Sequence, residues 1–518
     1  MTYDVVVAGA GPVGLMVANE LALRGVTVLV VERLTEPDLT IKAGGITVPT
    51  VEAFDRRGLL SELGAAQEYS LEKMREFMRA RMPAGSSAEP PAGGAPRRFA
   101  GHFGGIMLDA ERIDPDDPWL SGRGTAATIS LVAQPEIERI LAERADALGV
   151  EVRRGATVTG LDAGADGVRV HLGGSSAEGR FLVGADGGRS TVRKAAGFDF
   201  PGTDPQITGH QAIVEMSGDQ ALRPGWNVTD TGVYVNGPVP GRVLTVQFDG
   251  PPDDRDTPID AAELQAALRR TSGVEVTVHH IVSATRWTDN ARQATTYRLG
   301  RVLLAGDAAH VHSPFGGQGL NLGIGDAMNL GWKLAAELRG WAPAGLLDTY
   351  TAERHPIGAW VLDWTRAQVA AMRPEPYARA LRHVLEDLAH TVDGTTYLAS
   401  SIGGLRQRYD LPGDDPLIGR SVPDLRLDDG TRLADHLHDG AGVLLDPGST
   451  WADQPGRLRV LRTGSVERPD LKGLLVRPDG IVAWAGEEGT RDAAVRTWFG
   501  TLDQRRSAPD VAGRPSGT

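Results

Sequence analysis

The N-terminal pattern of apolar and polar positions predicts a strand, a helix and a second strand. Residues 3–8 (YDVVVA) and 26–31 are short apolar runs typical of buried strands, and the second run ends at Glu32. Residues 12–24 carry apolar positions at helical spacing between them. The same signals predict helices over 48–57, 134–148, 319–338 and from 346 past 364, and a strand over 301–305. The chain therefore opens as a βαβ unit.

The middle of the chain has a different pattern. Segments 232–237, 242–248 and 275–282 alternate apolar and polar residues. This alternation predicts an antiparallel sheet with one face on a core. Strand signals also alternate from residue 150 to residue 183, with a turn near 163–167.

Two other stretches bear on domain organisation. Residues 83–98 are rich in Pro, Gly, Ala and Ser, which is typical of a surface loop or an insertion. From about residue 417 to residue 502, strands alternate with polar turns and end in a helix near 490–499. We therefore expect a domain boundary near residue 405.

Composition excludes several classes of function. The 518 residues are enough for roughly three domains. A net charge of −13 argues against a nucleic-acid surface, which needs a basic face. There is no run of about 18 apolar residues and no basic segment before the first strand, so we expect a cytoplasmic protein. The absence of cysteine excludes disulfides, thiolate nucleophiles and iron–sulfur clusters.

A glycine motif follows the first strand directly. Gly9, Gly11 and Gly14 allow a tight turn, close approach of a pyrophosphate and close packing of a helix on a strand. The helix start offers unpaired N–H groups to phosphates. Glu32, at the end of the second strand, can accept hydrogen bonds from both ribose hydroxyls. The combination predicts a dinucleotide site in preference to a packing turn with Glu32 as a surface charge.

Later motifs separate FAD from NAD. Asp186 follows a strand over 181–183, and Gly306 and Asp307 close the strand over 301–305. A carboxylate such as Asp307 can bind the ribityl hydroxyls, which NAD lacks. The segment 314–319 (PFGGQG) lets the backbone pass close to a flat ring, and the helix after it directs its N–H groups at the ring's C2 carbonyl.

With these motifs in place, the chain resembles the class A FAD-dependent aromatic hydroxylases, of the phenol hydroxylase and actinomycete polyketide hydroxylase type. The matching segments are GAGPVG (9–14), VVER (30–33), DRRGLL (55–60), GADGGRSTVRK (184–194), GRVLLAGDAAHVHSPFGGQGLNLGIGDAMNLGWKLA (300–335) and LLDTYTAERHP (346–356). The tail LKGLLVRPDGIVAWAG (471–486) is similar to the thioredoxin-like domain of these enzymes.

The resemblance implies FAD as cofactor and NADPH or NADH as co-substrate without a Rossmann site of its own. Gln134 would contact the FAD chain, and backbone near Val158 would meet the adenine. The residues expected at FAD are Gly9, Gly11, Pro12, Val13, Gly14, Glu32, Arg33, Lys42, Gln134, Val158, Asp186, Gly306, Asp307, Pro314, Gly317, Gly319, Leu320 and Asn321.

The expected fold class is α/β, or α+β overall. We assign 1–70, 100–185 and 290–370 to a Rossmann-like FAD domain, 71–99 and 186–289 to an antiparallel-sheet substrate domain, 371–405 to a helical connection, and 406–518 to a cysteine-free thioredoxin-like domain.

Two departures from the family pattern stand out. Where the family often has an arginine, residues 41–47 (IKAGGIT) have Lys42, which keeps one positive charge near the flavin but loses the bidentate fork. A thioredoxin-like domain without cysteine has no dithiol chemistry, so it is a structural element or an interaction surface.

The remaining candidates are less specific. His310 and His312 lack a third ligand, so we expect no metal. His279 and His280, like Trp332 and Trp364, fit structural or core positions. Residues that could line a substrate pocket, as an alternative to plain packing, are Phe103, Trp226, Tyr234, Gln247, Phe315 and Gly316.

The expected function is an NAD(P)H-consuming FAD monooxygenase of secondary-metabolite biosynthesis. By resemblance, it inserts one oxygen atom of O2 into a polycyclic aromatic, polyketide-like phenol or quinone through a flavin C4a-hydroperoxide. Baeyer–Villiger insertion on a similar ketone stays open, as do a flavin dehydrogenase and a non-catalytic flavin-bearing carrier; a halogenase is disfavoured because no Trp-x-Trp pair occurs. No catalytic base can be named from the sequence, and a homodimer is a family expectation.

Overall fold

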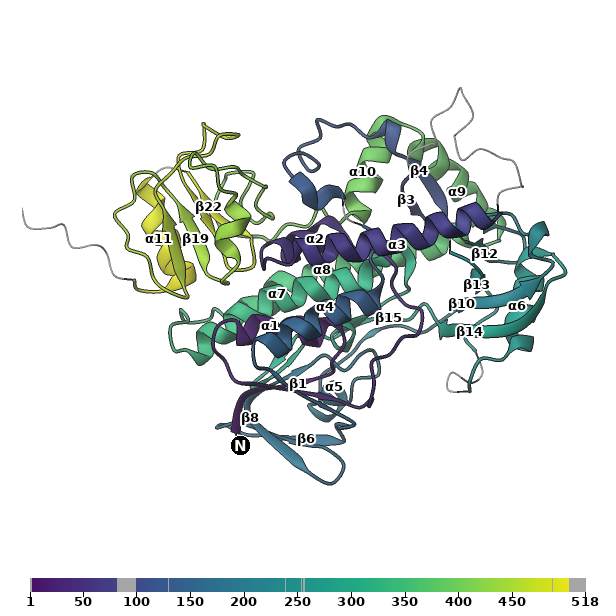
Figure 1. The fold of residues 1–518 in the computed structure, drawn as a ribbon, viewed down its shortest axis with the longest axis horizontal. Coiled ribbons are helices and arrows are strands. Elements are labelled where there is room, and N and C mark those ends of the chain that lie inside the picture. Colours follow the sequence, from purple (N-terminus) through teal and green to yellow (C-terminus); the bar gives the residue numbers. More distant parts are fainter. Residues whose placement is uncertain are drawn as a thin grey trace, which may run out of the picture.

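A parallel sheet forms the base of the molecule in the computed structural model (Figure 1). The structure describes residues 2–81, 99–128, 130–237, 239–252, 254, 257–486 and 488–502. The expected loop at 83–98 lies outside these residues. The strand order is β16-β17-β8-β1-β2-β5, in which all strands but β16 run parallel. Its strands are β1 (Thr2–Ala8), β2 (Val28–Glu32), β5 (Glu151–Arg154), β8 (Ser176–Gly184), β16 (Arg298–Leu299) and β17 (Val302–Leu304), with the hairpin β6 (Gly160–Ala163) and β7 (Val168–His171) paired to β8.

Helices cover this sheet because its central strands are apolar on both faces. Val5, Val6 and Val7 of β1 are fully buried, as a central parallel strand requires. Helix α1 packs against both α4 and α7, and α8 lies beyond α7 (Figure 1). The bounds are α1 (Pro12–Ala22), α2 (Val48–Asp55), α4 (Gln134–Ala147), α5 (Thr191–Ala195), α7 (Gln318–Leu338) and α8 (Thr349–Met372). The expected helices at 12–24, 48–57, 134–148 and 319–338 are confirmed within a few residues of these ends, and the helix expected from 346 past 364 is α8.

A second sheet stands at one end of the helical layer (Figure 1). Its order is β11-β12-β13-β10-β14, and every neighbouring pair is antiparallel, as the alternation predicts. The strands are β10 (Thr208–Ser217), β11 (Gly225–Val228), β12 (Val233–Asn236), β13 (Arg242–Gln247) and β14 (Thr277–Trp287). Helix α6 (Ala261–Ser272) covers one face, and Phe315 and α8 pack on the other.

The C-terminal domain stands at the opposite end of the helical layer (Figure 1). It has a four-stranded mixed sheet of order β20-β19-β21-β22 and one long helix. Its elements are β19 (Gly442–Leu445), β20 (Leu458–Leu461), β21 (Leu474–Val476), β22 (Val482–Ala485) and α11 (Glu488–Phe499). Trp332 of α7 packs in the core of this domain, so its expected core role is confirmed.

Several elements escape the sequence patterns. Helix α3 (Leu60–Arg81) runs through the expected boundary at residue 70, so that boundary is wrong as a break in the chain. The hairpin β3 (Phe99–Phe103) and β4 (Ile106–Asp109) was expected within the FAD domain, but its core is shared with α8 and α10. The other elements are α9 (Pro376–Ala389), α10 (Val392–Ile402), the short strands β9 (Gly202–Thr203), β15 (Ala291–Gln293) and β18 (His310–Val311), and 3₁₀ turns that include η4 (Gly306–Ala308) and η5 (Phe315–Gly317).

Candidate functional site

The turn at residues 9–14 joins β1 to α1 with backbone packed against backbone. A Cβ on Gly9 would lie 2.3 Å from the carbonyl oxygen of Ala185, and one on Gly14 would lie 2.0 Å from that of Gly9. A Cβ on Gly11 would meet nothing within 4 Å. Gly11 caps α1 without a side-chain hydrogen bond, so the N–H groups of the first turn are open. The turn is therefore closed toward the sheet and open toward a ligand.

Glu32 is oriented by the backbone at the end of β2. Its Oε2 accepts from the Ala10 N–H at 2.9 Å and its Oε1 from the Leu34 N–H at 2.9 Å. The carboxylate thus lies beside the glycine turn, where a carboxylate oxygen retains lone pairs for a hydroxyl. It borders a cleft of about 310 Å³.

The cleft brings together many of the residues expected at FAD. It is lined by the first turn, the end of β2 and three arginines, and its predicted members are Gly9, Gly11, Glu32, Arg33, Lys42, Val158 and Asp186. Arg154 and Arg189 also line it. The open helix N-terminus and the cations favour an anionic ligand such as a pyrophosphate, and four acidic residues line the same cleft: Glu32, Asp38, Glu138 and Asp186.

Lys42 lies in this cleft, which borders the first turn. Its Nζ pairs with the Asp38 carboxylate at 2.8 Å. Burial alone would raise the pKa of Asp38, but Lys42 and Thr40 lower it to about 2. Lys42 therefore lines the cleft as one partner of an ion pair.

Asp186 and Gln134 are held by local contacts. Asp186 caps α5, accepting from the N–H groups of Thr191 and Val192 and from the Ser190 hydroxyl. Gln134 begins α4 outside the cleft lining, and its backbone N–H donates to the carbonyl oxygen of Ala43. Gln134 thus fixes the segment that carries Lys42.

The turn at residues 306–319 packs directly on the first turn through Val13. Gly306 has φ +62°, and a Cβ there would lie 3.0 Å from the Val13 side chain. A Cβ on Gly323 of α7 would lie 2.4 Å from the same side chain. Pro12 is the first residue of α1, just before Val13. Gly306 lets the chain reverse in the left-handed region, which leaves Asp307 exposed between buried neighbours.

The start of α7 lies beside Asp307. A Cβ on Gly319 would lie 3.8 Å from the Asp307 Oδ1 and 3.7 Å from the His312 Nε2. The His312 Nε2 is buried and has no hydrogen-bond partner among the described residues. Gly317 caps α7 in the left-handed region without a side-chain bond. A carboxylate, an orphaned imidazole nitrogen and an open helix start therefore converge here.

The other predicted residues of this motif surround the helix start. Asn321 accepts from the Thr47 N–H and the Thr50 hydroxyl and donates to the carbonyl oxygen of Gly317. Pro314 is exposed and Leu320 is buried. Asn321 thus ties the turn to α2.

Aromatic rings meet on the face of the second sheet that is opposite α6. Phe315 lies 5.2 Å from Trp287 edge-on and 6.1 Å from Trp226, centroid to centroid. His102 lies 4.2 Å from Trp226. The Trp287 Nε1 is buried and has no acceptor among the described residues. A groove of about 220 Å³ adjoins this aromatic cluster, because Val369 lines the groove and packs in the cluster.

Three of the expected pocket residues lie elsewhere. Tyr234 packs in the core under α6, and its hydroxyl accepts from the Arg223 N–H. Gln247 alternates with Val246 and Phe248 of the aromatic face and therefore points to the α6 side. Phe103 packs edge-on against Trp364 at 4.9 Å, in a separate core. These placements correct the expectation, whereas Trp226, Phe315 and Gly316 lie near the aromatic cluster and α8.

Two residues of this cluster were missed from the sequence. Trp287 ends β14, and its ring fills the space that a Cβ on Gly209 would need. His102 lies on the β3–β4 hairpin, next to residues without a recognisable pattern. Burial lowers the pKa of His102 to about 4. Its Nδ1 accepts from the Gly105 N–H, so the ring is neutral at pH 7 with its proton on Nε2.

These features fit FAD on structural grounds. The open Gly11 side of the first turn and the arginine-lined cleft suit an ADP moiety. The exposed Asp307 and the orphaned His312 nitrogen suit a hydroxylated chain further along. Among the described residues, no group of three His, Asp or Glu side chains could hold a metal ion. No helix in the part of the chain that the structure describes is long and apolar enough to cross a membrane.

Comparison with known proteins decides the family. The FAD binding domain family matches residues 2–365, and the C-terminal domain family of aromatic-ring hydroxylases matches residues 415–501. The chain belongs to the FAD-binding aromatic-ring hydroxylases. It is an FAD-dependent aromatic monooxygenase that uses NAD(P)H, with an α/β FAD-binding fold, antiparallel sheets and a C-terminal hydroxylase domain.

Relatives match this hydroxylase along its length. The chain is 41% identical to the 12-dehydrotetracycline 5-monooxygenase/anhydrotetracycline 6-monooxygenase of Streptomyces rimosus, over 96% of this chain and 99% of the relative. It is 40% identical to the rifampicin monooxygenase of Streptomyces venezuelae, over 96% and 99%. The structure of the OxyS anhydrotetracycline hydroxylase from Streptomyces rimosus aligns with a TM-score of 0.81 at 38% identity, over 97% and 100%.

Proposed function

We propose that this hydroxylase adds one oxygen atom of O2 to a polycyclic aromatic, polyketide-like phenol or quinone in secondary-metabolite biosynthesis. The observation that carries the proposal is the aromatic cluster with an indole N–H that has no acceptor among the residues that the structure describes. Flat rings suit a flat substrate, and a buried donor selects a ligand oxygen. Relatives named for tetracycline and rifampicin oxidation support the same substrate class.

In this proposal the first turn and its cleft hold the ADP moiety of FAD, and the turn at 306–319 holds the rest. The FAD residues are those predicted from sequence, with Gln134 acting through the segment at residue 43. When bound, FAD supplies the redox chemistry: it takes electrons from NAD(P)H and activates O2.

The protein's own residues orient the substrate and exclude water. Trp226, Trp287 and Phe315 form an apolar platform beside the start of α7. The Trp287 Nε1–H donates to a substrate oxygen. His102, neutral and protonated on Nε2, is a second donor near Trp226. No residue is assigned as a base.

The proposed domain division follows the chemistry. Residues 1–81, 110–185 and 290–370 serve FAD, with the first boundary moved to the end of α3, and the β3–β4 hairpin (99–109) and residues 186–289 serve the substrate. Residues 371–405 connect to a thioredoxin-like domain from 406 onward, which lacks dithiol chemistry because the chain has no cysteine. We also propose a cytoplasmic enzyme that forms a homodimer.

The test is NAD(P)H oxidation with a panel of polycyclic phenols and quinones, with product mass and carbon connectivity measured on the same samples. We expect a substrate to speed NAD(P)H oxidation and to give a product heavier by one oxygen atom on an intact carbon skeleton. An oxygen inserted into the ring system would favour the Baeyer–Villiger alternative. An oxidised product without added oxygen would favour a dehydrogenase.

A matched pair of variants tests the role of the aromatic face. Trp287→Phe keeps an aromatic ring but removes the orphaned N–H, so we expect KM to rise about three- to tenfold with little change in stability. Tyr234→Phe also removes one polar hydrogen, but on the α6 face, so KM should stay unchanged. Equal effects of the two variants would contradict the assignment of this face to the substrate.

A further inference from the structure

A buried carboxylate holds the turn that displays Asp307. The Asp326 Oδ2, on α7, accepts from the Gly306 N–H at 3.0 Å and lies 2.7 Å from the His310 Nε2. Asp326 and His310 are both fully buried. Burial alone would raise the pKa of Asp326, but His310 and Arg354 outweigh it and keep the pKa below its usual value. The turn is thus pinned from behind by an ionised group that cannot reach water.

Arg354 of α8 neutralises this carboxylate. Its Nε donates to the Asp326 Oδ1 at 2.8 Å, and its Nη2 donates to the carbonyl oxygen of Leu322 at 2.9 Å. A Cβ on Gly325 would lie 2.7 Å from the Arg354 Nη2, so a glycine is needed for the guanidinium to cross α7. The third contact of Arg354 is the Tyr409 hydroxyl, which accepts from Nη1 at 3.1 Å.

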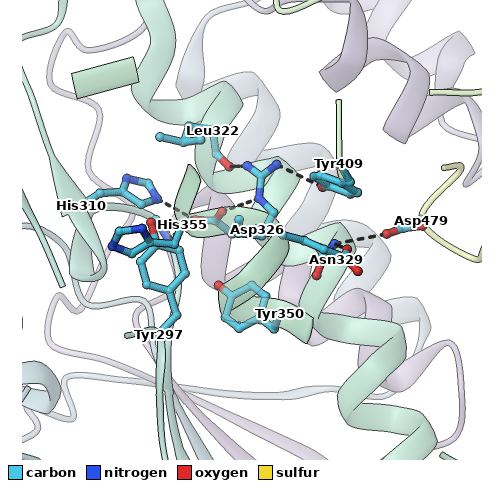
Figure 2. A network of polar contacts seen from close by, with 12 residues as sticks. Tyr297, His310, Leu322, Asp326, Asn329, Tyr350, His355, Tyr409 and Asp479 are labelled. Atoms are coloured by element: carbon cyan, nitrogen blue, oxygen red, sulfur yellow. Dashed lines mark hydrogen bonds and ion pairs between the residues drawn. The ribbon is translucent and has the colours of Figure 1, made fainter. Parts of the chain in front are cut away.

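Tyr409 joins this network to the C-terminal domain. Figure 2 shows Asp326 between His310 on one side and Tyr409 on the other. The Tyr409 N–H donates to the carbonyl oxygen of Gly419, and the Gly419 N–H donates to that of Val482 in β22. Five links therefore lead from the Gly306 turn to the C-terminal sheet without passing through solvent.

A second buried cluster fastens the C-terminal domain to α7 and α8 beside Tyr409. Arg477 follows β21 and donates through Nη1 and Nη2 to both oxygens of Glu353 at 2.8 and 2.7 Å. Lys333 of α7 reaches Glu353 at 2.9 Å, and Asn329 contacts both Glu353 and Asp479. Arg477 and Lys333 are fully buried. A buried charge left without its partner is costly in free energy. The C-terminal domain therefore has one well-defined docked position, in which all of these charges are paired.

We propose that the C-terminal domain, in this docked position, strengthens cofactor binding, with Tyr409 as the positioning residue. Tyr409 holds Arg354, Arg354 holds Asp326, and Asp326 fixes the Gly306 N–H so that Asp307 faces the cofactor. The inference rests on the proposed place of FAD at the Gly306–Gly319 turn. It gives the cysteine-free domain a function that needs no dithiol: the docked domain stiffens the cofactor turn.

Tyr409→Phe tests the link because it removes one hydroxyl and leaves the ring in place. The Arg354 Nη1 then loses its acceptor, and we expect the Kd for FAD, measured by titration of the apoprotein, to rise about three- to tenfold. The matched control is Trp451→Phe, which removes a hydrogen bond to Asp492 inside the same domain but lies outside the network. It should leave the Kd for FAD unchanged. Equal Kd shifts in both variants would overturn the proposal.

Reciprocity supplies a second readout that a merely structural role would not move. If domain docking strengthens FAD binding, FAD must strengthen domain docking by the same factor. We therefore expect FAD to slow hydrogen exchange at the amides of Tyr409, Gly419 and Val482 in the wild type, and the slowing to be lost in Tyr409→Phe. No slowing by FAD in the wild type would refute the coupling.

Asp307→Ala separates failure of this inference from failure of the proposed FAD site. A weaker affinity for FAD in that variant, together with an unchanged Kd in Tyr409→Phe, would leave the FAD site standing and reject the link to the C-terminal domain. An unchanged affinity in Asp307→Ala would reject the site itself.

Discussion

The two turns assigned to FAD are built in different ways. The turn at residues 9–14 takes its shape from its own glycines and from the backbone of the neighbouring strands, with Ala185 and Val31 in contact with Gly9. The turn at 306–319 has glycines too, but its first residue is held by Asp326, which depends on Arg354 and on Tyr409. The first turn is fixed mainly by backbone packing, with the Glu32 carboxylate accepting from the Ala10 N–H, and the second is fixed by buried charges.

This difference has a consequence for how each turn responds to change. Close backbone contacts tolerate no added atoms, but they are insensitive to pH and to distant substitutions. A buried ionic chain transmits a change at any of its members, because each partner that is removed leaves a desolvated charge behind. The first turn should therefore lose its shape only when one of its own residues is changed, whereas the second should also lose its shape when a distant member of the ionic chain is changed.

The largest effect is expected for Asp326→Asn. The substitution keeps the shape of the side chain but leaves Arg354 buried without a counter-charge, and side-chain exposures of 2% and 0% in this pair allow no rescue by water. We expect a loss of about 3–5 kcal/mol in the free energy of unfolding, measured by urea denaturation. FAD binding should weaken as well, because Gly306 loses its anchor.

Asp363→Asn is the matched control on α8. Asp363 pairs with Arg366 at 2.9 Å, but its side chain is 79% exposed. Its loss should change the free energy of unfolding by less than about 1 kcal/mol. A similar cost for both substitutions would mean that the charges behind the second turn contribute no more than surface charges do.

A smaller effect is expected from adding one methyl group to the first turn. Gly14→Ala places a Cβ 2.0 Å from the carbonyl oxygen of Gly9, so α1 has to move off the strand at a cost of about 1–3 kcal/mol in the free energy of unfolding of the apoprotein.

Gly11→Ala separates folding from binding at the same turn. Its φ of −74° suits alanine and its Cβ meets nothing, so the free energy of unfolding of the apoprotein should fall by less than about 1 kcal/mol, the cost of alanine in place of glycine at an N-cap. The methyl group points into open space at the helix start, where we place the pyrophosphate, so the Kd for FAD should rise. Gly11→Ala with unchanged FAD affinity would show that the cofactor does not approach this turn.

The sequence predicts the first turn almost completely. The strand, the glycines, the helix and Glu32 follow one another along the chain, so the local pattern determines the fold of this turn, and its role at FAD stays a prediction. The helices over 134–148 and 319–338 follow from apolar spacing for the same reason. The buried parts of the central parallel strands are predicted equally well, because burial on both faces selects apolar runs such as Val5–Ala8 and Val28–Val31.

The sequence predicts the second turn and the aromatic face only in part. Asp326, Arg354 and Tyr409 lie on different elements, and only the fold shows that they meet. In the second sheet, alternation predicts two faces but does not say which one carries the aromatic cluster, so the sequence could not decide between pocket and packing for Tyr234 and Gln247, which lie on the α6 side. His102 and Phe103 are adjacent in sequence, yet they lie in different clusters because the hairpin sends successive side chains to opposite faces.

The smallest effect is expected on the pH dependence of the free energy of unfolding, and it should affect the second turn more than the first. Burial, helped by His310, lowers the pKa of His312, although the carbonyl oxygen of Ser313 and Asp307 oppose the shift. The unfolded chain therefore takes up a proton near pH 6.5 that the folded chain refuses. Because the unfolded state binds more protons in this range, the free energy of unfolding falls as the pH drops below that value.

His312→Gln removes this difference in bound protons between the unfolded and the folded state. We expect the loss of unfolding free energy between pH 7.5 and pH 5.5 to be smaller in His312→Gln than in the wild type, in urea denaturation at both pH values. The slope should not vanish, since His102, with its pKa lowered to about 4, acts in the same direction. Protection factors for hydrogen exchange, which correct for the intrinsic pH dependence of exchange, should fall on acidification around residues 306–319 before they fall around residues 9–14, because the first turn has no histidine. Equal slopes in the two proteins would mean that His312 takes up its proton without loosening the turn, and the contrast between a packed turn and a charge-held turn would then rest on Asp326 alone.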